Sequence, residues 1–271
     1  MLKAAAAAGP RQIVLLAALP WEVRPFCRLL KARRRRDLGL PAWEFKLERI
    51  KGLAALTGMG AEAARQAARR VLTSFRPEVL LSVGFGGALS PELPPGALVL
   101  GASLWQYDPD AAMVSPVSAP APPRPFTELL ARLQEAGLPA FAASLVSTPG
   151  IVAKQGGGPG LRTLEHAVLD LETAALADLA ASEGLAFLAL RALTDAAAEE
   201  IPDFIVAAGG QVGALEALGW LAADPRRLRD LLHLWRRSRL AAARLAQAIR
   251  VLLPALVAAG PDLQNQPAQE G

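Results

Sequence analysis

The chain has 271 residues, of which 52% are hydrophobic, and this is enough to build a sizeable core. The single cysteine, Cys27, excludes an intrachain disulfide, and one cysteine with only two histidines argues against a metal site of ordinary spacing. The net charge is +4 with a pI of about 9.7, but the positive charge gathers in residues 31–36 and 226–250 without a recognised binding motif, which argues against a nucleic-acid partner.

The first ten residues begin with Met-Leu-Lys and five alanines, a pattern that superficially resembles a signal peptide. Pro10 and Arg11 interrupt it, so we expect a flexible N-terminus over 1–10 and a buried strand from Ile13. No apolar stretch reaches the roughly 18 residues of a membrane-spanning helix. A lone cysteine fits a reducing compartment, and we expect a cytoplasmic protein.

Apolar runs and their punctuation predict the elements in chain order. Pro20 predicts a helix start, and this helix should reach about Leu30 with a kink at Pro25. Further helices are expected up to Leu72 and over 126–136, and a proline-rich surface loop over 115–125. Strands are expected over 13–18, 43–48, 53–57, 79–83, 140–146 and 186–195. Strands that alternate with helices, without an internal repeat, predict one α/β domain with a mixed sheet.

Two carboxylates lie at element boundaries in the second half of the chain. Glu172 precedes Thr173 and two alanines that open a helix, whereas Asp195 ends a continuous apolar strand. Ligands of α/β proteins bind at the carboxyl ends of parallel strands. We therefore expect both acids to face one crevice, an arrangement suited to acid/base work on a small ligand.

After Asp195 the pattern changes. Residues 212–256 carry Leu, Ala, Trp and Arg at helical spacing, with a break at Asp224–Pro225, which predicts two appended helices. The spacing is lost over 257–271, where we expect a frayed tail.

The sequence Asp170-Leu-Glu-Thr-Ala-Ala-Leu-Ala177, followed by Leu190-Arg-Ala-Leu-Thr-Asp195, resembles the paired signature of the nucleoside phosphorylase/nucleosidase superfamily. The branch it resembles most is the methylthioadenosine/S-adenosylhomocysteine nucleosidases. Four further segments match this pattern in the same order: Ala18-Leu-Pro-Trp-Glu-Val23, Thr57-Gly-Met-Gly60, Val83-Gly-Phe-Gly-Gly-Ala-Leu89 and Ser147-Thr-Pro-Gly-Ile-Val152. The resemblance spans about residues 13 to 200.

This resemblance implies a three-layer mixed-sheet sandwich over 11–210, with appended helices over 211–256 packing on it and a flexible tail over 257–271. It implies a purine nucleosidase that cleaves the N-glycosidic bond of a 5′-substituted adenosine and releases adenine, needs no cofactor and forms a homo-oligomer. The transition state of such a cleavage is an oxocarbenium-like sugar.

The resemblance also implies residue roles. Glu22 would deprotonate the attacking water, Glu172 would bind the ribose hydroxyls and stabilise the sugar cation, and Asp195 would protonate or hydrogen-bond N7 of the purine. The remaining substrate-binding residues implied are Leu19, Gly58, Gly84, Phe85, Gly86, Ile151, Val152 and Leu171. A plainer interpretation is that the acids only cap helices or a strand end and that the glycines only form turns.

Several departures leave the substrate open. Pro20 and Trp21 replace two acids of the family pattern, Phe85 replaces a small residue, and Ala97 stands where the family has an acid. A phosphate-dependent phosphorylase would need an arginine site, for which Arg24 and the 33–36 run are candidates, but Glu22 favours hydrolysis. A futalosine-type hydrolase and a non-catalytic nucleoside-binding protein are also compatible with these residues.

The basic segment 218–241, rich in Leu and Trp, is similar to the C-terminal region of hopanoid-associated nucleosidases, which release adenine from adenosylhopane. This similarity implies a place in hopanoid biosynthesis. A basic amphipathic helix within 218–250 also predicts a peripheral contact with an anionic membrane, although covering the core or a subunit interface would explain it equally well.

Overall fold

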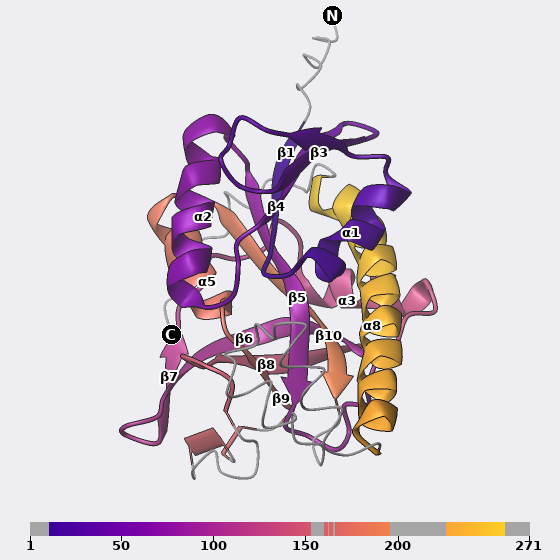
Figure 1. Cartoon of the computed structure of the whole chain (residues 1–271). Coiled ribbons are helices and arrows are strands. Elements are labelled where there is room, and N and C mark those ends of the chain that lie inside the picture. The colour runs from indigo at the N-terminus through magenta and orange to yellow at the C-terminus, as the bar shows by residue number, and fades with distance from the viewer. Residues whose placement is uncertain (1–10, 153–159, 162, 165, 196–225, 258–271) are drawn as a thin grey trace, which may run out of the picture.

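The computed structural model describes residues 11–152, 160–161, 163–164, 166–195 and 226–257. Strands and helices alternate through most of the chain and end in one long helix (Figure 1). The strands are β1 (Arg11–Ala17), β2 (Arg33–Arg35), β3 (Ala42–Leu47), β4 (Ile50–Leu56), β5 (Val79–Ala88), β6 (Leu98–Asp108), β7 (Met113–Val117), β8 (Ala140–Ser147), β9 (Ala167–Asp170) and β10 (Ala186–Asp195). The helices are α1 (Pro20–Leu29), α2 (Ala61–Ser74), α3 (Phe126–Glu135), α5 (Thr173–Ser182) and α8 (Arg226–Val257).

The ten strands of the described residues all belong to one mixed sheet. β1 lies between β4 and β5 and is parallel to both, and β5 is also parallel to β10. β6 pairs antiparallel with β10 and parallel with β8, while β9 pairs parallel with β8 and antiparallel with β5. These pairings close β5, β9, β8, β6 and β10 into a ring, and β4, β3 and β2 extend the sheet on the other side of β1.

Helices cover both faces of the sheet, as Figure 1 shows, with α2 and α5 on one side and α1, α3 and α8 on the other. The strand sequences explain this arrangement, because alternate residues of one run enter two different cores. Ile13 and Leu15 of β1 pack in the core with α1, α3 and α8, whereas Val14 and Leu16 pack in the core with α2 and α5. A continuous apolar run is therefore what a strand buried on both faces requires. The predicted α/β mixed-sheet fold is confirmed.

Four strands were not expected: β2, β6, β7 and β9. The predicted loop over 115–125 begins instead with the end of β7, which pairs with β6 through Leu104–Asp108. Pro116 obscured it, since proline is tolerated in a strand only at an edge. The basic run likewise contains β2, which pairs with β3 at the edge of the sheet. Its charged, largely exposed residues are typical of an edge strand that discourages pairing with other chains.

The C-terminal helix α8 begins directly after Pro225 and is 32 residues long. Its described inward side chains belong to the core shared with α1 and α3, and Leu245, Ile249 and Leu252 are fully buried. The first of the two expected helices and the terminal segments 1–10 and 258–271 lie outside the described residues. Among the described helices none has the length and apolarity to cross a membrane.

Candidate active site

The site forms where parallel strands end. β1, β4, β5 and β10 run in the same direction, so their carboxyl ends meet at one edge of the sheet. The chain leaves β1 towards Glu22, leaves β4 towards Gly60, and β10 ends on Asp195. The topology thus brings together residues that are far apart in the sequence.

Glu22 lies in the first turn of α1 and is 3% exposed. Its Oε2 accepts a hydrogen bond of 2.7 Å from the Leu19 N–H, and its Oε1 accepts one of 2.8 Å from the Phe85 N–H at the end of β5. A Cβ on Gly84 would lie 3.0 Å from Oε1, so a residue without a side chain lets β5 approach this closely.

Burial raises the pKa of Glu22 to about 7, although these backbone N–H groups and the Arg191 charge oppose the rise. A carboxyl with a pKa near neutrality is suited to act as a general base.

Glu172 occupies the N-cap position of α5 and is half-buried. Its Oε1 accepts a hydrogen bond of 2.8 Å from the N–H of Gly60, the residue before α2. Desolvation, with the nearby negative charge of Asp170, raises the pKa of Glu172 to about 7. The Glu22 charge raises it further, so the two carboxyl groups lie close enough to influence each other.

Behind the two carboxyls lies a fully buried ion pair. Arg191 of β10 is 1% exposed and Asp170 of β9 is 6% exposed. Nε and Nη2 of Arg191 lie 2.9 and 2.7 Å from Oδ2 of Asp170. Nη2 also donates to Ser82 Oγ at 2.9 Å and to Thr173 Oγ1 at 2.7 Å. The sequence pattern gives neither charged residue a role, although an arginine inside an apolar strand is itself a signal, because charged residues are almost never buried unless paired.

The structure places the other predicted catalytic residue, Asp195, buried at the end of β10, where its Oδ1 accepts a hydrogen bond of 2.8 Å from Thr194 Oγ1. The strand-end position is as predicted, and its catalytic role stays a prediction. In the described part of the chain, no cluster of three or more His, Cys, Asp or Glu side chains could hold a metal ion.

The predicted binding residues fall into two groups. Leu19 and Phe85 are tied directly to Glu22 through their backbone N–H groups, and Gly84 touches it. Gly58 turns the chain after β4 with φ +78°, and Gly86 is closed in by Val168. Leu171 precedes Glu172 and is half-buried. Val152 packs on a separate small cluster with Tyr107 and Val146, and Ile151 is half-buried beside it, so their contact with a ligand stays a prediction.

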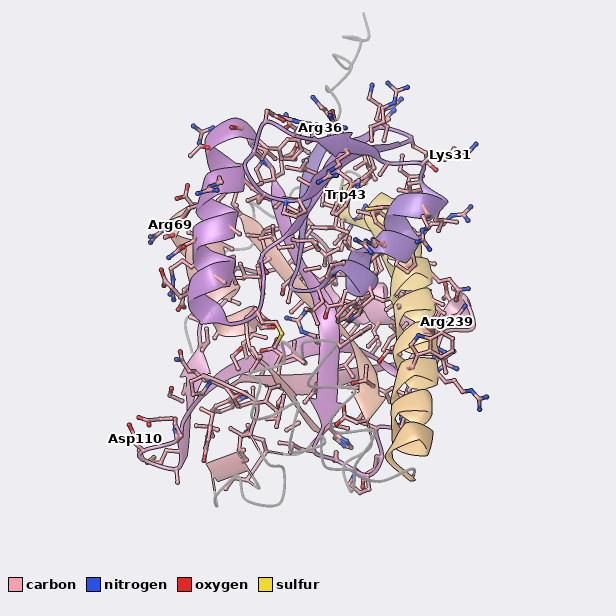
Figure 2. All side chains as sticks on the ribbon, viewed as in Figure 1. Lys31, Arg36, Trp43, Arg69, Asp110 and Arg239 are labelled. Atoms are coloured by element: carbon pink, nitrogen blue, oxygen red, sulfur yellow. The ribbon has the colours of Figure 1, made fainter. Side chains whose placement is uncertain are left out.

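The candidate phosphate-binding arginines lie at the surface of the protein. Arg24 is exposed on α1, and the 33–36 run lies at the sheet edge, with Arg33, Arg34 and Arg36 exposed. Figure 2 shows Lys31 and Arg36 on the outer rim of the molecule.

Comparison with known proteins gives the family. A model described as the phosphorylase superfamily matches residues 12–217. Curated protein sequences give no match. Among solved structures, futalosine hydrolase of Helicobacter pylori has a TM-score of 0.69 at 13% identity, over 91% of this chain and 98% of that chain. The 5′-methylthioadenosine/S-adenosyl homocysteine nucleosidase (MTAN) of Campylobacter jejuni has a TM-score of 0.66 at 17% identity, over 88% and 98%.

An MTAN mutant of Helicobacter pylori with 5′-methylthioadenosine in its active site has a TM-score of 0.66 at 14% identity, over 90% of this chain and 99% of that chain. These identities are low, so the structural matches establish the shared fold, and the family match rests on the sequence of more than two thirds of the chain. The chain belongs to the phosphorylase superfamily.

Proposed function

We propose that this protein is a purine nucleosidase that hydrolyses the N-glycosidic bond of a 5′-substituted adenosine and releases adenine. The observation that carries the proposal is the pair of carboxyl groups, Glu22 and Glu172, held by backbone N–H groups at one edge of the sheet with pKa values raised to about 7. The solved nucleosidase structures that share the fold support the reaction class.

The proposed reaction uses one proton acceptor and one proton donor. Glu22 takes a proton from a water molecule as the oxygen attacks C1′ of the ribose, and the C1′–N9 bond breaks. The electron pair stays on the purine, and the protonated Asp195 donates its proton to N7, so that adenine leaves as a neutral base and Asp195 is left as a carboxylate. Glu172 hydrogen-bonds the ribose hydroxyls and stabilises the positive charge that develops on the sugar.

Hydrolysis rather than phosphorolysis is favoured by the arginines. Phosphate recognition needs a guanidinium or ammonium group that can face the ligand. Arg191 is the guanidinium that acts on both carboxyls, and its Nε and Nη groups are already bonded to Asp170, Ser82, Thr173 and the Leu190 carbonyl. Arg24 is exposed on α1, and the 33–36 run begins with the edge strand β2.

For the 5′ substituent we propose a large apolar group, with adenosylhopane and hence hopanoid biosynthesis as the specific candidate. Two features support it: the resemblance of segment 218–241 to hopanoid-associated nucleosidases, and the apolar Leu19 and Phe85 on either side of Glu22. Trp21, next to Glu22, is 53% exposed and offers a further apolar surface.

The decisive experiment measures adenine release from adenosylhopane, methylthioadenosine, adenosylhomocysteine and the non-adenine substrate futalosine, with and without phosphate. We expect phosphate-independent release from an adenosine substrate and a loss of about 10²- to 10⁴-fold in Asp195→Asn and Glu22→Gln. Glu183→Gln, at the exposed opposite end of the Glu172 helix, is the matched control and should retain activity.

Three further outcomes would each point to a different protein. Release that requires phosphate would make the protein a phosphorylase, and cleavage of futalosine alone would make it a futalosine-type hydrolase. Binding of a nucleoside without cleavage would leave a non-catalytic binding protein and overturn the proposal.

We further propose that α8 contacts an anionic membrane peripherally from the cytoplasm. Trp235 is 55% and Leu240 45% exposed, Arg236 and Arg239 are exposed between them, and the Arg239 guanidinium lies over the Trp235 ring at 4.7 Å. Figure 2 shows Arg239 pointing away from the body of the protein. Basic and aromatic side chains on one helix are typical of interfacial binding.

This contact is tested by cosedimentation with phosphatidylglycerol-containing and neutral vesicles. Binding to the anionic vesicles should weaken in Trp235→Ser and with salt. If the exposed residues instead cover a subunit interface, the same substitution will change the molar mass in solution, where we expect a homo-oligomer.

A further inference from the structure

The ion pair behind the site is the centre of a polar network that joins four strands and one helix. Arg191 of β10 donates two hydrogen bonds to Ser82 of β5. Its Nη2 donates to the Ser82 hydroxyl at 2.9 Å, and its Nη1 donates to the Ser82 carbonyl oxygen at 3.1 Å. Asp170 of β9 accepts a hydrogen bond of 2.6 Å from Ser147 Oγ of β8. The Thr173 hydroxyl of α5 donates to Asp170 and accepts from Arg191. All five residues are buried.

The network holds the start of α5, where Glu172 lies. Asp170 and Thr173 flank Glu172 in the sequence, and the next N–H, that of Ala174, donates to Ser147 Oγ at 2.9 Å. The backbone on both sides of Glu172 is thus fastened to β8, β9 and β10. The freedom of the Glu172 carboxylate is correspondingly small.

The same network holds the segment that binds Glu22. Ser82 lies two residues before Gly84 on β5, and the following Phe85 donates its N–H to Glu22. β5 also pairs with β10 over Arg191 and Gly84. One guanidinium therefore fixes the supports of two carboxyl groups that come from α1 and from the start of α5.

Stability alone does not account for this ion pair. A buried ion pair loses so much solvation that well-packed apolar residues of similar volume often serve the fold as well or better. Arg191 and Asp170 are both buried, and their charges reach beyond the pair: that of Arg191 acts on Glu22 and Glu172, and that of Asp170 acts on Glu172.

We propose that Arg191 and Asp170 are a positioning pair of the proposed nucleosidase, which touches no ligand itself and holds Glu22 and Glu172 at the separation and orientation that the reaction needs. The proposal rests on the function proposed above. It differs from a purely structural role in one respect, because the Arg191 and Asp170 charges act on the pKa of Glu172 in opposite directions and the Arg191 charge also lowers that of Glu22.

Charged and polar groups surround both carboxyls. Glu22 faces the N–H groups of Ala18, Leu19 and Phe85 and the Arg191 charge, which all lower its pKa. Glu172 faces Asp170 and Glu22, which raise its pKa, and the Gly60 N–H and Arg191, which lower it. Loss of the Arg191 charge should therefore raise the pKa of Glu22, whereas loss of the Asp170 charge should lower that of Glu172.

The test compares Arg191→Met, Arg191→Lys and Asp170→Asn in the full-length protein. The pKa values of Glu22 and Glu172 are read without substrate from ¹³C NMR of labelled glutamate carboxyls, with Glu22→Gln and Glu172→Gln to assign the signals. We expect Glu22 to titrate at higher pH in Arg191→Met, Glu172 to titrate at lower pH in Asp170→Asn, and Arg191→Lys to retain the wild-type titration of Glu22.

Activity provides the second readout. The acidic limb of the kcat/KM profile should move to higher pH in Arg191→Met and to lower pH in Asp170→Asn. Arg191→Lys should lower kcat without changing the pH of this limb. Ser147→Ala is the uncharged control: it loosens the network, so kcat should fall without a shift of the limb.

If Arg191→Met or Asp170→Asn does not fold, Arg191→Lys and Ser147→Ala still decide the question, because both should keep the wild-type carboxyl titrations and lose kcat. Wild-type kcat in both of these folded variants would overturn the positioning role. Opposed titration shifts in a protein that cleaves no nucleoside would support the pair and contradict the nucleosidase proposal, so the two failures are distinguishable.

Discussion

The Glu172 carboxylate accepts a hydrogen bond of 2.8 Å from the backbone N–H of Gly60, a residue 112 positions earlier in the chain. Gly60 precedes α2 with φ +90° and ψ 160°, a conformation that is essentially restricted to glycine. The bond joins the start of α5 to the start of α2, and these helices pack on the same face of the sheet. The turn after β4 is therefore part of the site.

Substitution of Gly60 by alanine tests this connection. The added methyl group would meet no atom within 4 Å, so its cost is backbone strain of about 1–3 kcal/mol. Any adjustment of the turn moves the N–H away from Glu172, and we expect kcat/KM to fall about tenfold or more. The control is Gly137→Ala, which also has positive φ and open space but lies after α3. It should destabilise the protein comparably in thermal unfolding and retain its specific activity; equal activity losses in the two variants would contradict the role of Gly60.

Activity should depend on the ionisation of the Glu22 and Glu172 carboxyls. Glu22 must be ionised to accept a proton from water, and Glu172 must be ionised to stabilise a cation. Both pKa values are raised to about 7, so kcat/KM should rise as the pH increases through this value, in a transition that belongs to the coupled pair. The measurement is a pH–rate profile from pH 5 to 9. A profile that is flat down to pH 5 would show that neither group titrates as the site geometry requires.

The free energy of unfolding of the protein without substrate should change with pH in the direction opposite to kcat/KM. A carboxyl whose pKa is raised from 4.5 to about 7 by folding binds its proton more tightly when folded, so its contribution to stability falls as pH rises through this range. Glu172→Gln removes the titrating group and can still accept the Gly60 hydrogen bond. We expect it to exceed the wild-type free energy of unfolding by on the order of 1–3 kcal/mol at pH 8, with a smaller difference at pH 5. Urea unfolding at the two pH values measures this, and an equal difference at both would be inconsistent with the raised pKa.

The C-terminal helix should behave as part of the core. Leu252 is fully buried among side chains of the core shared by α1, α3 and α8, so Leu252→Ala should lower the free energy of unfolding by about 2–5 kcal/mol. Gln247 on the same helix is exposed, and Gln247→Ala should change stability by less than about 0.5 kcal/mol. Chemical denaturation of both variants checks this, and a small effect at Leu252 would mean that α8 only rests on the domain.

The sequence by itself determined the class of fold and where the acids stand in it. Continuous apolar runs such as Ile13–Ala17 predict strands buried on both faces, and the structure confirms this with two separate cores. Pro20 predicts a helix start near Glu22, and the end of the apolar run predicts a strand end at Asp195. Both features depend on neighbouring residues, so a local pattern is enough to predict them. Strand β7 could not be predicted in this way, because Pro116 argues locally against a strand. A strand at the edge of a sheet tolerates proline, and the local sequence does not reveal that β7 lies at an edge.

Only the tertiary structure decided how these pieces meet. The closure of β5, β9, β8, β6 and β10 into a ring brings Arg191 onto Asp170, and the turn after β4 brings the Gly60 N–H onto Glu172. Such contacts depend on register and pairing between distant segments, which a local pattern does not specify. The raised pKa values of Glu22 and Glu172 follow from this closure, because desolvation requires neighbours that the linear sequence does not place.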